Sequence, residues 1–333
     1  MVNRLLRNTT NLLLLFAGLA CNEEFSPKTE FDERIVVYAI ASSNQSSATV
    51  SAVVMRSFDL DGVNPTGAAV DPTIRGATVI ATARGATTTL RETRKPGVDS
   101  LTGIGPRWYY IGSIGAFPGD QISLTVDLPD GRRLAAQTQL PPSRYLQTTP
   151  EFPPTGVFTA DDPYHFGTAW IFDWESAAGD QVLFFPSLHL IYDRRGDSGF
   201  VSYSREVPLR MVNQGGTMVG EYPGATTASK AEFEFAAIDE TMRAISEGDP
   251  EKNRYVIIGF NWEFLEFDFA LSRYYSTVNG YLDAYSVRLD ETVYSNVSGG
   301  IGVFGSRLGY SLLYTVDPNY AGRFGYITGK TGD

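Results

Sequence analysis

The side chains that could perform acid–base or nucleophilic chemistry are few and scattered. Asp173 and Glu175 flank Trp174 on an expected strand, and they share one face because side chains alternate along a strand. Two carboxylates near an aromatic ring are typical of glycoside hydrolases, where about 5 to 9 Å separates them. His165 and His189 are the only imidazoles, and no G-x-S-x-G nucleophile elbow accompanies them. We expect the carboxylates to lie on a solvated strand face and both histidines to be structural, so the sequence predicts no enzyme.

Two further motifs resemble ligand sites but lack the context that such sites need. Residues 300–305 match G-x-G-x-x-G, yet no strand-then-helix pattern surrounds them, which favours a glycine-rich loop over a nucleotide site. Residues 59–64 resemble the start of a calcium loop, but Val63 and Val70 stand where oxygen ligands are required. Two histidines and one cysteine are too few for a zinc site built from His and Cys ligands, which needs three or four of them. We therefore predict no cofactor and no metal.

Composition narrows the class of protein. The chain has 333 residues, of which 43% are hydrophobic and 13% aromatic, typical of a β-rich protein. It carries 27 Lys and Arg against 38 Asp and Glu, a net charge of −11. Nucleic-acid binding needs clustered basic residues, so we predict no nucleic-acid partner. A single cysteine excludes a disulfide within the chain.

The single cysteine has a specific place in the sequence. Arg4 and Arg7 precede a short apolar run over residues 12–17, which is too short to span a membrane. The sequence Ala-Gly-Leu-Ala then leads directly to Cys21 and resembles the lipobox of bacterial lipoproteins. The resemblance implies that residues 1–20 are a cleaved signal peptide and that Cys21 is acylated, which makes the lipid bilayer a partner.

Two acidic residues follow the cysteine. Glu23 and Glu24 resemble the surface-export signal of Bacteroidota-type lipoproteins, which implies an outer-membrane protein that faces the cell exterior. A plain solvated tether over residues 21–33 is the alternative. Removal of residues 1–20 takes away two arginines and no acid, so the net charge becomes 25 − 38 = −13. Such an acidic chain would be repelled by an anionic membrane surface, so we expect the lipid to hold it there.

Residues 34–142 are predicted to form an Ig-like β-sandwich. Alternating apolar residues at 122–128 and 134–140 flank the turn Pro129-Asp130-Gly131, which predicts an antiparallel hairpin. Residues 77–94 predict a second hairpin that turns at Gly85. Pro141-Pro142 marks the expected boundary.

Residues 143–333 are predicted to form a second β-rich domain with one or two short helices. Residues 168–174 and 181–192 resemble a pair of strands joined by a turn. Residues 255–271 form a long aromatic strand region, with a phase slip near Leu265 that suggests a β-bulge. Ile238, Met242 and Ile245 have helical spacing, and a second helix is expected over residues 272–282.

Aromatic clusters are the better candidates for binding. Trp108, Tyr109 and Tyr110 form one cluster, and Tyr274 with Tyr275 begins another. Exposed aromatic rings bind sugars, peptides or proteins at low entropic cost. The alternative, which we expect for a part of them, is burial in a core.

The whole layout resembles a family of Bacteroidota outer-membrane lipoproteins that share a domain of unknown function. The most specific match is an Asn-x-x-Gly-Gly-x-Gly-x-Phe-Gly signature, carried here by a short set of residues near the end of the chain: Asn296, Gly299, Gly300, Gly302, Phe304 and Gly305. The Arg75–Val79 segment, the Pro-Asp-Gly turn and the Asp-Trp-Glu strand match more softly. The resemblance also accounts for the false nucleotide motif.

The resemblance implies a non-enzymatic binding or accessory lipoprotein beside a TonB-dependent transporter or another envelope protein. A glycan- or peptide-cleaving enzyme and a structural envelope component are the alternatives. The sequence leaves the ligand, the oligomeric state and the membrane face open.

Overall fold

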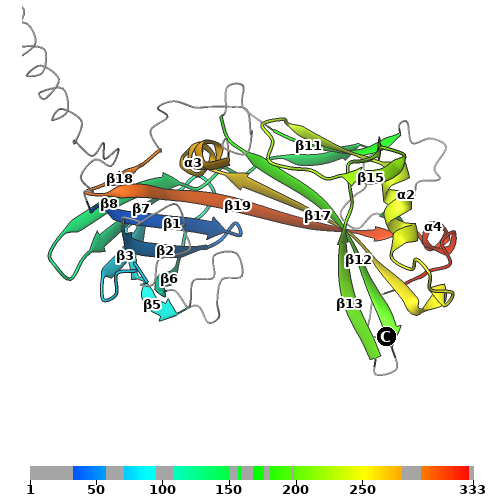
Figure 1. Cartoon of the computed structure of the whole chain (residues 1–333), viewed down its shortest axis with the longest axis horizontal. Coiled ribbons are helices and arrows are strands. Elements are labelled where there is room, and N and C mark those ends of the chain that lie inside the picture. The colour runs from blue at the N-terminus through cyan, green and yellow to red at the C-terminus, as the bar shows by residue number, and fades with distance from the viewer. Residues whose placement is uncertain are drawn as a thin grey trace, which may run out of the picture.

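The protein is mainly β. The computed structural model describes residues 33–57, 71–94, 108–149, 157–158, 168–175, 181–196, 199–279 and 294–329. In Figure 1 the described chain begins at the left-hand end, and the sheets extend from there along the longest axis.

The first part is a β-sandwich, as predicted. One face comes from β1 (Ile35–Ser43), β2 (Ala48–Arg56), β6 (Trp108–Ile114) and β5 (Arg91–Arg94). The other sheet runs in the order β18 (Val297–Ser298), β8 (Arg133–Gln139), β7 (Gln121–Asp127), β3 (Thr78–Ala83) and β4 (Ala86–Thr89). Alternate side chains of both sheets, such as Val50 and Leu124, meet in one buried cluster.

The second part is built around an aromatic core. One sheet has three strands, in the order β16 (Lys230–Glu234), β11 (Ala169–Trp174) and β9 (Leu146–Thr149). Aromatic side chains of this sheet pack against those of β12 (Phe184–Gly196) and β17 (Tyr255–Phe267). The remaining elements are β13 (Gly199–Glu206), β14 (Arg210–Gln214), β15 (Thr217–Glu221), α2 (Phe235–Ala244), η1 (Lys252–Arg254), α3 (Phe269–Asn279), α4 (Pro318–Gly322), β10 (Val157–Phe158) and β20 (Ile327–Thr328).

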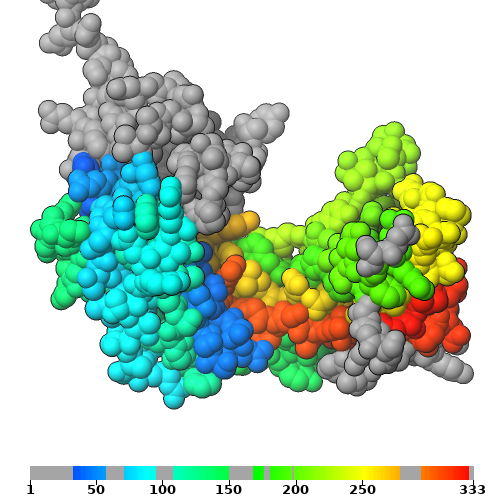
Figure 2. Space-filling view, turned by 90° about the horizontal axis from the view of Figure 1, so that it is seen from below, coloured from blue at the N-terminus to red at the C-terminus, as the bar shows by residue number. Residues whose placement is uncertain are grey.

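One strand belongs to both parts. The first half of β19 (Ile301–Val316) pairs in parallel with β1, from Val36 opposite Ile301 to Ser43 opposite Leu308. Its second half pairs antiparallel with β17, up to Phe260 opposite Tyr314. A single sheet therefore runs in the order β13-β12-β17-β19-β1-β2-β6-β5 (Figure 1). Figure 2 shows β19, in orange and red, reaching from the sandwich to the far end.

The β7–β8 hairpin is confirmed, and the hairpin predicted over residues 77–94 is confirmed up to the end of β4. Residues 91–94 instead form β5, which crosses to the other sheet and pairs with β6. The β3–β4 turn uses Arg84 and Gly85 at φ 52° and 78°, which suits a two-residue turn with positive φ at both positions. The β7–β8 hairpin turns at Gly131, with φ 88°. Helix α2 buries Ile238 and Met242 on its core face, as their spacing predicts.

Two local predictions are wrong. Residues 168–174 do not pair with 181–192, because β11 lies between β9 and β16 whereas β12 lies between β13 and β17. The β17 bulge falls at Ile258, where the register shifts between Gly259 and Ile257. The parity change beyond Leu265 instead marks the end of the strand, since Phe269 already belongs to α3.

The two buried clusters divide near the predicted boundary. The sandwich cluster ends along the chain at Leu140, but it also contains Val297 and Phe304. The second cluster draws on residues from Trp170 to Tyr326. A cut at residue 142 therefore omits the β18 and β19 residues that complete the sandwich.

Candidate functional site

Several predicted site residues lie outside the described residues. They are Cys21, Glu23 and Glu24, together with His165 and the calcium-like turn at 59–64. Lipidation and export therefore stay predictions from the sequence.

The residues of the C-terminal signature connect the two sheets of the sandwich. The side-chain amide of Asn296 bonds to one strand of each sheet: it donates to the Gln137 carbonyl on β8 at 3.1 Å and to the Phe304 carbonyl on β19 at 2.8 Å. Its side-chain oxygen accepts from the Phe304 amide at 2.9 Å. The chain then pairs with β8 through Val297 and enters β19.

The glycines of the signature allow backbones to approach closely. A Cβ on Gly302, at φ 118°, would lie 2.1 Å from the Val37 carbonyl oxygen. A Cβ on Gly300 would lie 2.6 Å from the Ile35 oxygen, and one on Gly305 would collide with Leu271 of α3. These positions accept only glycine for packing reasons.

The Trp108 cluster divides between surface and core. Tyr110 is 2% exposed, and its hydroxyl donates to the Ile74 carbonyl at 2.9 Å. Burial raises the pKa of Tyr110. Trp108 and Tyr109 are half-buried, and the Arg75 guanidinium lies 3.9 Å from the Trp108 ring centroid. Only Trp108 and Tyr109 therefore remain as binding candidates here.

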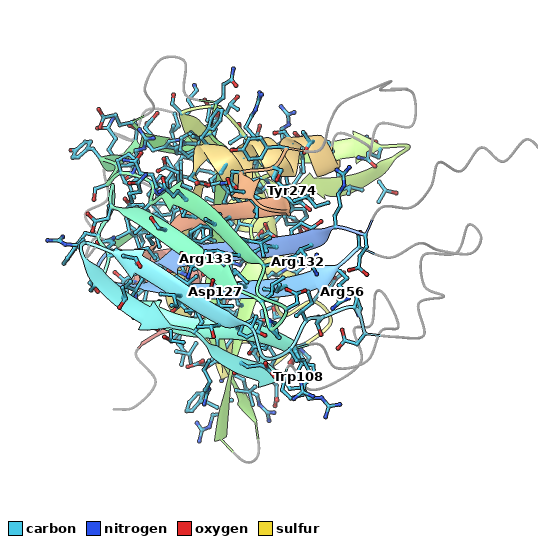
Figure 3. The ribbon with its side chains drawn as sticks, turned by 90° about the vertical axis from the view of Figure 1, so that its left-hand side faces the viewer. Arg56, Trp108, Asp127, Arg132, Arg133 and Tyr274 are labelled. Atoms are coloured by element: carbon cyan, nitrogen blue, oxygen red, sulfur yellow. The ribbon has the colours of Figure 1, made fainter. Side chains whose placement is uncertain are left out.

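Tyr274 and Tyr275 pack on different neighbours. The Tyr274 ring lies 5.7 Å from that of Tyr38, and burial raises the pKa of Tyr274 well above its usual range. Tyr275 packs edge-on against Phe185, at 5.4 Å. Figure 3 shows Tyr274 well apart from Trp108, so the two predicted clusters form no common platform.

Asp173 and Glu175 do not form an enclosed pair. Trp174 points into the core, whereas Asp173 is half-buried at a position opposite Lys230 and Glu175 is exposed. Coulombic attraction to Asp173 adds to the raised pKa of Lys230, whose main cause is its hydrogen bond to Glu232. The geometry fits a charged sheet surface better than an acid–base pair.

His189 lies between two hydroxyls on the half-exposed face of β12. Its Nε2 is 3.3 Å from Ser187 Oγ, and its Nδ1 is 3.4 Å from Ser204 Oγ. Both distances are long, and all three side chains come from the open surface of one sheet. This arrangement supports the structural interpretation of the histidine.

The junction between the two parts holds a buried charged cluster that was not predicted from the sequence. Arg144 and Glu266 form a forked ion pair with an Nη2–Oε1 distance of 2.7 Å, and their side chains are 8% and 1% exposed. Asp268 accepts from the Thr138 hydroxyl and, at 2.8 Å, from the Leu271 amide. Burial raises the pKa of Asp268, and these hydrogen bonds oppose the shift.

A pocket of about 630 Å³ opens beside this cluster. Gln121, Gln137, Gln139 and Phe269 contribute to its wall. Its carboxylates are already held by protein donors. Its amides are engaged as well, because Gln121 Nε2 donates to Gln137 Oε1 at 3.1 Å and Gln139 Nε2 donates to the Gly119 carbonyl at 3.0 Å. The pocket is therefore poorly suited to acid–base catalysis.

The described residues contain no group of His, Cys, Asp and Glu that could hold a metal ion. Within the same part of the chain, no helix has both the length and the apolar character to cross a membrane.

Comparison with models of known protein families and with curated proteins finds no match for this chain. The lipoprotein family suggested by the signature therefore stays a prediction.

Proposed function

We propose that this protein is a lipid-anchored outer-membrane protein that faces the cell exterior and acts as a non-enzymatic binding module. Its partner would be a TonB-dependent transporter or another envelope protein. The observation that carries the proposal is a set of exposed apolar side chains on two hairpins of the second part, namely Phe200, Val201 and Tyr203 on β13 and Met218, Val219 and Tyr222 on or beside β15. On each hairpin, exposed aromatic and aliphatic groups of this kind mark an interaction surface.

The distribution of charge supports a lipid-anchored protein whose second part lies away from the membrane. Residues 34–142 contain 10 Lys and Arg against 8 Asp and Glu, a net charge of 10 − 8 = +2. Residues 143–333 contain 14 against 25, a net charge of 14 − 25 = −11. A tether at Cys21 would hold the non-acidic sandwich near an anionic membrane and leave the acidic part further away.

Lipidation is tested first. In a bacterial host that processes lipoproteins, Cys21→Ala should abolish incorporation of labelled palmitate and move the protein from the membrane to the soluble fraction. Glu23→Ala with Glu24→Ala should keep the lipid but protect the protein from protease added to intact cells. Labelling that persists in Cys21→Ala would contradict the anchor.

Partner binding is tested by mild-detergent extraction of the tagged, lipidated protein and affinity purification. Enrichment of an outer-membrane barrel supports the accessory role, and recovery of the protein alone counts against it. Activity on a panel of polysaccharides and peptides that disappears in Asp173→Asn would favour the enzyme alternative. A deletion strain with a weakened envelope and normal uptake would favour a structural component.

A further inference from the structure

The long sheet ends in two very different edges. At one end β5 is four residues long, and Arg91, Glu92 and Arg94 give it charge along most of its length. Short, charged edge strands are a common protection against unwanted strand pairing. At the other end β13 has eight residues, of which all but the last are exposed. The described part of the chain places no strand against its outer side.

The apolar side chains of β13 lie on both faces of this open edge. Phe200 is 53% exposed on one face, whereas Val201 and Tyr203 are 51% and 42% exposed on the other. Neither proline nor a register shift interrupts the pairing of β13 with β12. In Figure 1 the β12–β13 ribbon projects away from the body of the molecule, at the opposite end from the start of β1.

The hydrogen-bond register determines which backbone groups are free. The Val207 amide donates to the Leu188 carbonyl at 2.8 Å, which makes these two residues a hydrogen-bonded pair. Pairs alternate along an antiparallel ladder, so Val201, Tyr203 and Arg205 bond to β12. The N–H and C=O groups of the intervening residues, which include Ser202 and Ser204, therefore point outward.

The strand is held in place before any partner arrives. The Tyr203 ring stacks on Tyr192 at 5.4 Å and 18°. Ser202 Oγ donates to Asp193 Oδ1 at 2.5 Å, and Asp193 is 1% exposed. A pre-ordered edge lowers the entropic cost of adding a further strand.

Charge distinguishes between possible occupants. Arg195 lies opposite Phe200 in the β12–β13 register, and Arg205 lies near the other end of β13. Among the described residues, neither arginine forms an ion pair with a carboxylate. A second copy of the chain would bring another strongly acidic body, with a net charge of −11, to this end of the molecule. An extended partner segment that carries its own carboxylates can compensate both arginines locally.

We propose that β13 is a strand-addition site that accepts an extended, acidic segment of a partner protein. The inference rests on the proposed function in that the partner belongs to the cell envelope. Main-chain bonds from the outward groups of β13 give affinity, and Arg195, Arg205 and the exposed rings select the segment.

The probe is a fluorescent peptide, Thr-Glu-Val-Thr-Val-Thr-Glu-Val, titrated against the full protein in mild detergent and followed by anisotropy. Its two Glu are five residues apart and so lie on opposite faces of an added strand, as Arg195 and Arg205 do on the β12–β13 hairpin. Ser204→Pro removes one outward N–H, and we expect binding to weaken by about tenfold or more. Ser204→Ala keeps that N–H and should bind like the wild type, although it also removes the contact with His189. A matched peptide with Lys in place of Glu should bind at least about fivefold more weakly.

Arg195→Glu with Arg205→Glu is the second variant, because it leaves the backbone unchanged if Ser204→Pro disturbs the hairpin. It should reverse the preference between the two peptides. Equal binding by wild type and both variants, or no binding of the acidic peptide up to about 1 mM, would overturn the inference. A dimer in sedimentation that Ser204→Pro dissociates would replace it with self-pairing.

The same variants separate this inference from the proposed function. An envelope protein that co-purifies equally with wild type, Ser204→Pro and the arginine variant would leave the proposed function in place and refute the edge site. Peptide binding that depends on Ser204 and both arginines, with no envelope protein recovered, would support the edge and count against the transporter partner.

Discussion

Arg144 and Glu266, 122 residues apart along the chain, form a buried ion pair between the two parts of the molecule. Arg144 follows β8 of the sandwich, and Glu266 lies on β17 of the second part. The backbone amide of Arg144 also donates to the Tyr310 hydroxyl at 3.0 Å. Together with the shared strand β19, this pair makes the junction a packed interface.

We predict that breaking this pair destabilises the protein strongly. Arg144→Met leaves the Glu266 carboxylate buried without its cation, and such losses cost about 3–5 kcal/mol. The double variant Arg144→Met with Glu266→Leu should recover most of the loss, because it removes both charges. Urea denaturation of the three proteins measures the effect, and a double variant as unstable as the single one would contradict it.

The pH dependence of stability should reveal Asp268. Burial raises its pKa in the folded protein above the ordinary value of 3.8, so the folded state binds this proton more tightly than the unfolded state. The contribution of Asp268 to stability is therefore full below the unfolded pKa and is lost as the pH rises through the folded pKa. Asp268→Asn keeps an acceptor for the Leu271 amide but cannot ionise.

The difference between wild type and Asp268→Asn isolates this group from the other carboxylates. The variant should gain stability relative to the wild type as the pH rises above the ordinary pKa of 3.8 and through the raised folded-state pKa of Asp268. Denaturation curves at several pH values give the difference directly. Parallel stability profiles for the two proteins would refute the assignment.

The sequence was sufficient where structure depends on near neighbours. Alternation on both sides of the Asp130-Gly131 turn predicts the β7–β8 hairpin, because the turn and the core face are both encoded within 20 residues. The spacing of Ile238 and Met242 predicts α2 in the same way.

Pairing between distant segments could not be predicted. The pairing of Val37 with Gly302 unites strands from opposite ends of the chain, and no local pattern specifies that partner. For the same reason the sequence predicts a β11–β12 pair, although the two strands lie in different sheets. One feature of the sequence does point to the junction site. Glu266 lies on the same face of β17 as the buried Trp262 and Phe264. A carboxylate on a core face needs a cation beside it, because an unpaired buried charge is costly. The sequence does not indicate which arginine supplies it.

Gly302 provides a test of the signature as a structural connection between the two sheets. Gly302→Ala would place a methyl group against the Val37 carbonyl in a backbone conformation that disfavours any side chain. We expect a loss of about 3 kcal/mol or more, or failure to fold. Gly309→Ala is the matched control on the same strand, since its Cβ would lie 3.9 Å from Leu265 Cδ1. Thermal denaturation of both variants should separate them, and equal melting temperatures would contradict the close-approach argument.

Tyr110 tests the division of the aromatic cluster between core and surface. Its hydroxyl accepts from the Ala77 amide at 3.0 Å and donates to the Ile74 carbonyl, so Tyr110→Phe leaves one buried and one partly buried backbone group without this partner. We expect a loss of about 1–3 kcal/mol in the free energy of unfolding. Tyr145→Phe is the control, because Tyr145 is 71% exposed and should change stability by less than about 0.5 kcal/mol. Urea denaturation measures both variants. If Tyr110→Phe retained full stability but lost partner binding, the hydroxyl would belong to a binding surface, and the assignment of Tyr110 to the core would be wrong.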